Sequence, residues 1–513
     1  MRRFARALLC ASMLTLAGTA VAAPATAGAT DEPRPKPAVA QWALETSLAI
    51  PVAAALDDRQ GLAGPLTPTG LKWRADARLV DARTASFDGR TTVLTANGAG
   101  LDTAGPFGVT AWTHVDDNVC TGERTAVSAD GLHTSAFRLV FDCATRVWRF
   151  EVADRDVTAP AYASVAAPVD AEHWTHLAGS FDPATARLAL YVDGTLTAAT
   201  TAPADWVAAR GPGWDAGQIV VGRDRRADVD GGWFAGQIAD VRLFDRPLLD
   251  EDLTGGFGEP GVVEPVLVGR WGFDEGRACY DPAVTACVAT DQSSWDRQLK
   301  LTSGALMVEE GGPDSFALAL DTTHWIEDPS DPHYGVPTQE YGRSQRNANP
   351  TGEPSWEDRA VLRTDESFTI STWVRLDDTT EPRTVLAQDS TAGGYSGFTI
   401  GYAAGRWEFT VRRAKTLAGD SSVASAPATD PTGWHHLVAV LDQTERQVRL
   451  YVDGTLADSE PLHARYRPWQ ANGPFLVGRG TTPAGPAGWL HGSVDRIQVF
   501  QGAYTDAWVT GLD

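Results

Sequence analysis

The sequence predicts an all-β protein that consists of two tandem β-sandwiches or jelly rolls. An internal repeat is the first indication, because the seven residues Leu190–Leu196, LYVDGTL, recur as Leu450–Leu456. Many short runs also alternate between apolar and polar residues, which is typical of half-buried strands. Turn-forming residues are abundant, with 50 glycines and 31 prolines among 513 residues. Short strands separated by frequent turns favour a sandwich over a helical fold.

The repeat extends along most of the chain. Phe107–Trp112 matches Phe368–Trp373, and Gly236–Phe244 matches Gly492–Phe500. Near the start of the copies the offset is smaller, which predicts an insertion in the second copy at about residues 322–359. A stretch of 216 or more residues per copy suits one large two-sheet domain.

These matches predict the domain organisation. The first domain covers residues 40–255, and the second covers residues 266–513 with the insertion inside it. A linker rich in glycine, proline and glutamate, residues 256–265, joins them. Residues 28–39 are rich in proline and charge, which is typical of an extended spacer.

Residues 1–27 have the pattern of a secretion signal. Arg2, Arg3 and Arg6 are followed by the apolar stretch 7–21 and by small residues that suit cleavage. No later stretch approaches the ~20 apolar residues of a membrane helix. We therefore expect a secreted, extracellular protein that does not stay in a membrane after the signal is cleaved.

Charge and cysteine content narrow the function further. The formal net charge is −23, which argues against a nucleic-acid partner because phosphates need basic surfaces. Four cysteines follow the signal, and an even number in an exported protein favours disulfide bonds. Four cysteines allow three pairings. We favour the local pairing, Cys120–Cys143 and Cys279–Cys287, because it keeps each bridge inside one half of the chain. A zinc site is the alternative, but no Cys-x-x-Cys pattern or histidine pair has metal-ligand spacing.

Individual strands can be placed in the second copy. Phe368–Leu376 alternates, with Phe368, Ile370 and Val374 on one face, and Trp407–Val411 alternates as well. Val448–Leu456 is predicted to be a hairpin with an Asp-Gly turn. Short helical turns are expected near Leu248–Leu253 and Ala503–Trp508.

With these segments in order, the sequence resembles the LamG-like, concanavalin A-like jelly-roll modules of secreted bacterial proteins. The motifs of the second copy that carry the resemblance are Trp271–Gly276, Phe368–Val374, Trp434–Leu437, Leu450–Gly454 and Gly492–Ile497. The resemblance implies two tandem concanavalin A-like jelly-roll β-sandwiches. It does not fix a function, because one fold hosts many activities.

Aromatic residues are the candidate ligand contacts. The insertion holds four of them: Trp325, Tyr334, Tyr341 and Trp356. Tryptophan and tyrosine stack on sugar rings, and neighbouring carboxylates bond hydroxyls. The alternative is that the insertion covers its own domain with these rings. Trp112 and Trp373 are further candidates if their strand face is open, and otherwise they pack the sandwich.

The resemblance also implies a possible calcium site. It pairs the aspartate of one strand motif, Asp88 or Asp321, with an aspartate of the closing motif, which is Asp495 in the second copy. The first copy has Ala239 at the matching position. The alternative is that Asp321 is a turn residue and Asp495 a surface residue.

Catalysis is not expected. A retaining glycosidase needs two carboxylates about 5 Å apart, and no strand carries them at alternate positions in an apolar setting. We therefore expect a secreted, non-catalytic recognition or adhesion protein that binds extracellular glycans or surface proteins. A structural spacer of a cell-surface assembly is the alternative, followed by a divergent glycoside hydrolase or polysaccharide lyase.

Overall fold

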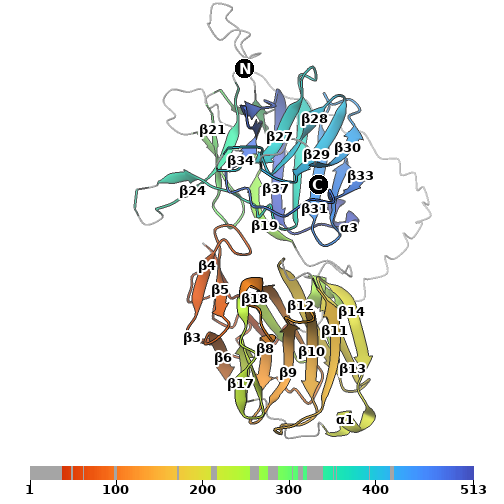
Figure 1. The fold of residues 1–513 in the computed structure, drawn as a ribbon. Helices are drawn as coiled ribbons and strands as arrows, with labels where there is room; N and C mark the ends of the chain where they lie inside the picture. The colour runs from red at the N-terminus through yellow and green to blue at the C-terminus, as the bar shows by residue number, and fades with distance from the viewer. Residues whose placement is uncertain are drawn as a thin grey trace, which may run out of the picture. The chain divides into compact units, whose positions relative to one another are not determined.

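A computed structural model describes most of the chain. The described residues are 37–47, 50–61, 63–97, 101–169, 173–209, 217–254, 265–274, 287–302, 304–309, 316–320, 339–349, 352–353, 355–391, 393–415 and 421–512. The predicted all-β class is confirmed: the strands form two sandwiches, one coloured from red to green and the other from green to blue in Figure 1.

The first sandwich has two antiparallel sheets. The sheet that contains β18, called the β18 sheet, comprises β1 (Ala40–Trp42), β2 (Glu45–Thr46), β4 (Lys72–Ala75), β5 (Arg83–Asp88), β7 (Phe107–Val115), β12 (Thr175–Asp182), β13 (Arg187–Val192), β14 (Thr195–Thr201) and β18 (Ala235–Phe244). The β10 sheet comprises β3 (Thr67–Thr69), β6 (Val93–Asn97), β8 (Glu123–Asp130), β9 (Ser135–Asp142), β10 (Val147–Ala153), β11 (Tyr162–Pro168) and β15 (Gln218–Val221). A hairpin, β16 (Asp224–Arg226) with β17 (Val229–Gly231), completes the domain, with η1 (Asp117–Val119), α1 (Ala204–Ala209) and α2 (Asp250–Thr254).

The second sandwich repeats this plan. The β37 sheet comprises β19 (Val266–Trp271), β22 (Leu306–Glu309), β23 (Phe316–Leu320), β26 (Phe368–Leu376), β31 (His435–Asp442), β32 (Gln447–Val452), β33 (Thr455–Pro461) and β37 (Gly492–Gln501). The β29 sheet comprises β20 (Cys287–Ala289), β21 (Gln298–Leu301), β24 (Gly342–Asn347), β25 (Trp356–Asp358), β27 (Arg383–Gln388), β28 (Phe398–Ala403), β29 (Arg406–Arg412), β30 (Ser421–Pro427) and β34 (Phe475–Val477). The hairpin of β35 (Gly480–Thr482) and β36 (Gly485–Ala487) and the helix α3 (Asp506–Val509) follow the same order as in the first domain. The two helical turns expected near residues 248–253 and 503–508 are present as α2 and α3.

Alternate side chains of each strand pack inward to form the two cores. Phe107 packs on Phe137 with ring centroids 5.0 Å apart, and Phe368 packs on Phe398 at the same 5.0 Å. The largest buried framework side chains also occupy matching strands: Trp42, Trp148, Trp271 and Trp407. The inner faces of the two domains therefore share one packing scheme, because each tryptophan buries a large apolar area.

The Asp-Gly turns predicted for the repeated hairpins are present. Asp453 has φ 51° and Gly454 has φ 74°, and the first copy has 48° at Asp193 and 77° at Gly194. Two successive positive φ values match the right-handed twist of the strands that a two-residue hairpin joins.

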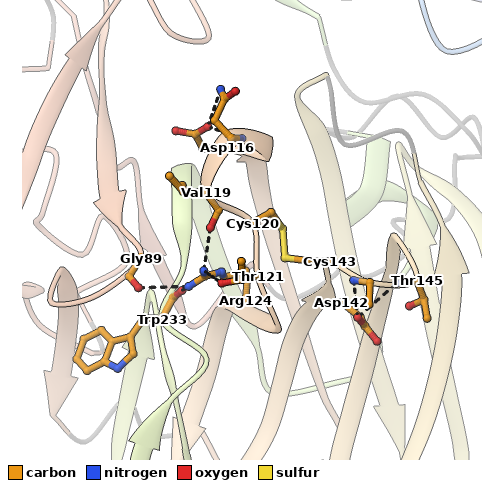
Figure 2. The surroundings of a disulfide bond; sticks show 12 residues. Gly89, Asp116, Val119, Cys120, Thr121, Arg124, Asp142, Cys143, Thr145 and Trp233 are labelled. Atoms are coloured by element: carbon orange, nitrogen blue, oxygen red, sulfur yellow. Dashed lines mark hydrogen bonds between the residues drawn. A yellow bond between two sulfur atoms is a disulfide. The ribbon is translucent and has the colours of Figure 1, made fainter.

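A disulfide bond joins Cys120 to Cys143, as the local pairing predicts (Figure 2). It links the segment before β8 to the segment after β9, with Cα atoms 5.6 Å apart. Beside it, the Arg124 guanidinium donates hydrogen bonds to the carbonyl oxygens of Gly89 and Trp233. The other predicted pair includes Cys279, which lies outside the described residues, so that pairing stays a prediction.

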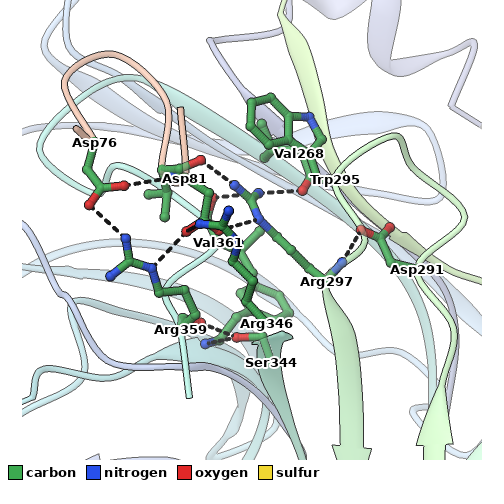
Figure 3. Close-up of polar contacts among 12 residues, drawn as sticks. Asp76, Asp81, Val268, Asp291, Trp295, Arg297, Ser344, Arg346, Arg359 and Val361 are labelled. Carbon is green, nitrogen blue, oxygen red and sulfur yellow. Dashed lines mark hydrogen bonds and ion pairs between the residues drawn. The ribbon is translucent and has the colours of Figure 1, made fainter. Parts of the chain in front are cut away.

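The β4–β5 loop, Asp76–Ala82, inserts side chains from the first domain into the second. Leu79 and Ala82 belong to the core cluster of the second sandwich. Arg297, whose side chain is 1 % exposed, donates a 2.5 Å hydrogen bond to the Val80 carbonyl and pairs with Asp81 at 3.3 Å. Arg297 and Asp81 face one another in Figure 3.

Asp81 is the centre of this contact. Its other carboxylate oxygen accepts hydrogen bonds of 2.8 Å from both Arg346 and Arg359. Arg359 also pairs with Asp76 at 2.7 Å (Figure 3). Burial opposes ionisation of Asp81, yet Arg297 and its two neighbours hold the pKa of this carboxyl below its ordinary value.

We predict that Asp81→Asn lowers the free energy of unfolding by about 3 kcal/mol at pH 7, because the buried Arg297 loses its counter-ion. A lowered pKa stabilises the fold above the unfolded-state pKa of about 3.9, and this contribution is lost as pH falls through the folded-state value. The variant should therefore show less loss of stability below pH 4 than the parent protein. Urea unfolding followed by tryptophan fluorescence measures both effects. The exposed Asp57→Asn is the control, and equal effects of the two substitutions would contradict the account.

Candidate ligand-binding surfaces

The aromatic candidates of the insertion fall into two groups. Trp325 and Tyr334 lie outside the described residues, so their role stays a prediction. Tyr341 directly precedes β24, and Trp356 lies in β25, which pairs with β24. On its other side β24 pairs with β34 in the β29 sheet. The described part of the insertion thus contributes strands to the sheet as well as aromatic side chains.

Tyr341 belongs to a cluster of an arginine and two aromatic rings. The Arg479 guanidinium carbon lies 4.3 Å from the ring centroid of Tyr341 and 5.7 Å from that of Trp489. The two rings meet edge to face with centroids 5.9 Å apart. Arg479 also pairs with Asp389 at 3.7 Å. The carboxylate and the rings together fix the guanidinium, which leaves a half-exposed surface of rings and polar groups.

Trp356 is the described tryptophan with the most exposed side chain, at 38 %. It lies in β25, opposite Asn347 of β24, and all three residues of β25 are exposed. A large exposed ring on a paired strand is held in place by the backbone, so little ordering is needed before it contacts a ligand.

Trp112 and Trp373 lie on the outer face of their sheets, away from the core. Trp373 stacks on His436, with ring centroids 5.1 Å apart and an interplanar angle of 16°. Trp112 lies 5.3 Å from the His176 ring, and the guanidinium carbon of Arg78 lies 5.3 Å from the Trp112 centroid. A histidine therefore covers part of each ring, and in the first domain the β4–β5 loop covers more.

Two of the calcium candidates, Asp88 and Asp495, accept hydrogen bonds within the protein. Asp88 accepts hydrogen bonds from the backbone N–H groups of Arg90, Thr91 and Thr92, which are 2.9, 2.8 and 3.0 Å away. Burial opposes ionisation of Asp88, but these bonds hold the pKa of its carboxyl far below the ordinary value. Asp88 thus shapes the turn that follows β5. Its carboxylate already accepts hydrogen bonds from these N–H groups and from the Thr91 hydroxyl, which does not suit a calcium ligand.

Asp495 is fully buried in β37 and accepts a 2.6 Å hydrogen bond from the backbone N–H of Arg496. Its expected partner Asp321 lies outside the described residues. Within the ranges that the structure describes, no group of three or more histidine, cysteine, aspartate or glutamate side chains is arranged to hold a metal ion. Calcium binding therefore stays a prediction that depends on Asp321.

An ionic network that the sequence analysis did not predict lies on the outer face of the β10 sheet. Arg138 pairs with Glu151 of the next strand and, at 3.0 Å, with Asp224 of the β16–β17 hairpin. Arg149 pairs with Glu151 at 3.1 Å and with Glu123. Arg226 completes the network by pairing with both Asp224 and Glu123.

The network favours the ionised forms of Asp224 and Glu123. Burial opposes ionisation of Asp224, yet Arg226 and Arg138 hold the pKa of its carboxyl below the ordinary value. The same balance, with Arg226, Arg138 and Arg149, lowers the pKa of Glu123. Carboxylates held in this way accept hydrogen bonds from arginine and are poor proton donors at neutral pH.

The comparisons with known proteins identify the family. The family model of the concanavalin A-like lectin/glucanases superfamily matches residues 87–254 and 351–510, together more than half of the chain. The protein therefore belongs to this superfamily, and the two matches confirm two tandem LamG-like domains. A comparison with curated proteins found no match.

Solved structures show a distant likeness only. Domain 4 of a GH43 extracellular arabinanase from Geobacillus stearothermophilus is 13 % identical, with 48 % of this chain and 98 % of that chain covered and a TM-score of 0.28. Domains LG4-5 of the mouse laminin alpha1 chain are 13 % identical, with 82 % and 88 % covered and a TM-score of 0.22. The binding domain of botulinum neurotoxin serotype D is 9 % identical, with 86 % and 97 % covered and a TM-score of 0.34.

We predict that His176, beneath Trp112, makes the first domain sensitive to mild acid. Burial, together with the nearby Arg242 and Arg78, lowers the pKa of His176 to about 4. The unfolded chain takes up this proton below about pH 6.5, whereas the folded chain resists until about pH 4, so stability falls over this window by about 3 kcal/mol. Chemical unfolding of His176→Gln between pH 7 and pH 4 should show a shallower loss. The half-exposed His133→Gln is the control, and a His176→Gln profile that parallels the parent would refute this origin.

Proposed function

We propose that this protein is a secreted, non-catalytic recognition protein that binds extracellular glycans or surface proteins. The observation that carries the proposal is the surface of half-exposed aromatic and polar side chains on the second domain. The Tyr341–Arg479–Trp489 cluster lies at one end of β24, and the exposed Trp356 lies on the strand paired with β24. Rigid rings that present an apolar face next to hydrogen-bonding groups suit recognition of sugars and of protein surfaces.

Secretion is supported by two features. The disulfide bond between Cys120 and Cys143 is of a kind that persists outside the cytosol. Residues 1–27 carry the pattern of an export signal, although they lie outside the described residues. In the part of the chain that the structure describes, no helix has the length and apolar character to cross a membrane.

The use of two acidic groups among the described residues supports a non-catalytic role. Glycoside hydrolysis requires one protonated carboxyl group beside a second carboxylate. On the outer face of the β10 sheet, where two glutamates approach each other, Glu123 and Glu151 are both paired with Arg149. Neither is placed to donate a proton to a glycosidic oxygen.

A rigid spacer of a cell-surface assembly is the second candidate. The contact between the β4–β5 loop and Arg297 favours it, because a buried ion pair joins residues of the two domains. Recovery of envelope proteins in a pulldown from the producing cell, with no glycan binding, would favour this candidate over the first.

A glycan array probed with the full-length protein tests the proposal. We expect binding to at least one class of extracellular polysaccharide. Repeating the array with EDTA tests the proposed calcium site at Asp321 and Asp495, since loss of signal would show that binding requires a divalent cation. An array without any bound glycan would contradict glycan recognition.

We predict that Trp356→Ala weakens binding to the glycan recovered from the array by at least about 1 kcal/mol, roughly fivefold, if the exposed ring contacts the ligand. Thermal stability should change little because the side chain is exposed. Leu456→Ala is a matched control, because Leu456 is 40 % exposed on β33 of the other sheet. Unchanged affinity in Trp356→Ala, measured by calorimetry, would remove Trp356 from the site.

A further inference from the structure

The two sandwiches differ at one corresponding side, where the outermost strands of the two sheets lie next to each other. In the first domain these strands are β11 and β14, and in the second domain they are β30 and β33 (Figure 1). Among the described residues, each of the four strands pairs with one neighbouring strand only. Each strand therefore has an outer row of backbone N–H and C=O groups that the sheet does not satisfy.

Side chains occupy this outer row in the second domain. The backbone N–H of Ser425 in β30 donates a 2.7 Å hydrogen bond to the Asp458 carboxylate of β33. Arg406 donates a 2.8 Å bond to the carbonyl oxygen of the same Ser425. Just after β33, the backbone N–H of His463 donates to the Ser422 hydroxyl at 2.8 Å. The edge of β30 is thus closed at Ser425 by groups of its own domain.

The first domain lacks all three of these contacts. The sequence repeat and the matching strand registers give the counterparts of Ser425, Arg406, Asp458, Ser422 and His463, which are, in the same order, Ala166, Val147, Ala198, Ala163 and Pro203. Alkyl side chains neither donate nor accept hydrogen bonds, and proline has no backbone N–H. These residues therefore leave the edge of β11 open at Ala166, which is exposed.

The neighbouring edge strands differ in charge as well. β14 has the sequence TLTAATT, with no charge and no proline, and six of its seven residues are exposed. β33 has the sequence TLADSEP, which includes Asp458, Glu460 and a proline at the end of the strand. Charged residues and proline on an edge strand oppose pairing with another chain, whereas a neutral run without proline allows it. The second domain thus has a protection that the first domain lacks.

A second copy of the same chain fits the open side of the first domain. A two-fold axis normal to the sheets sets β11 against β11 of the other copy, antiparallel, with the two β14 strands on the same side. With the axis at Val165, Ala166 lies opposite Ser164 of the second copy, and the two residues exchange a pair of backbone hydrogen bonds. Like charges do not meet in these strands, because β11 and β14 are both uncharged. This local neutrality matters in a chain with a net charge of −23.

We propose that β11 and β14 form a strand-addition surface through which two copies of the protein dimerise, and that the matching side of the second domain is closed to such a contact. Backbone hydrogen bonds between the β11 strands hold the dimer together. Stable interfaces bury roughly 1,200–2,000 Å², and a contact of strand edges is smaller, so the dissociation constant is expected in the micromolar range. The proposal concerns the first domain and does not depend on the ligand of the second.

Sedimentation velocity of the full-length protein, over a concentration series that spans the micromolar range, tests the dimer. We expect the parent to shift from monomer to dimer as its concentration rises. Ala166→Pro removes the N–H that pairs with Ser164, and the two-fold axis repeats this loss, so the dissociation constant should rise by at least about tenfold. Ala198→Asp installs the residue of the second domain and should weaken the dimer similarly. Ala457→Asp is the matched control, because it adds the same charge to an exposed residue of β33 and should leave the dimer unchanged.

A second measurement needs no variant and so does not depend on how the substitutions affect folding. Hydrogen–deuterium exchange of the parent at low and high protein concentration should show slower exchange at high concentration in β11 and β14, with β30 and β33 unchanged. A parent that stays monomeric over the whole series would overturn the dimer. In that case, slower exchange of β11 on addition of a synthetic TLTAATT peptide would assign the edge to a strand of another protein. A dimer that persists in both Ala166→Pro and Ala198→Asp, or that Ala457→Asp abolishes, would overturn this surface.

Discussion

An antiparallel sandwich must bury one face of each sheet, and this constraint divides every strand into two sets of residues. The inward set of β7 and β26 is mostly apolar in both domains, with Phe107 and Phe368 at matching places in the cores. The outward-facing side chains do not have to pack in the core. They therefore differ more between the two copies.

The outward-facing side chains differ between the β10 sheet and the β29 sheet. On the β10 sheet they form a network in which Arg138 is 5 % exposed and bonded on several sides, so that buried charges are neutralised locally. On the β29 sheet the same positions carry three threonines, a glycine, a proline and the acid Glu408. The ion pairs of the first domain neutralise buried charge, and these six positions of the second domain form no such network.

The sequence predicted the inner framework well because its signals are local. The alternation in Phe368–Leu376 defines β26 with the observed bounds, and the Asp-Gly turn defines the hairpin of β32 and β33. Surface features were harder to predict because they depend on register and on distant pairs. Arg297 and Asp81 are 216 residues apart, and Glu408 looks like an ordinary solvated residue until its strand neighbours are known.

The central claim is that the two domains have similar cores and that the second domain binds a glycan through the surface that Tyr341 and Trp356 mark at β24 and β25. Hydrogen–deuterium exchange of the full-length protein, with and without a neutral oligosaccharide, tests it most directly. The account predicts that the sugar slows exchange in β24 and β25 and leaves β9, β10 and β11 unchanged. Slowed exchange in the first domain alone would contradict it.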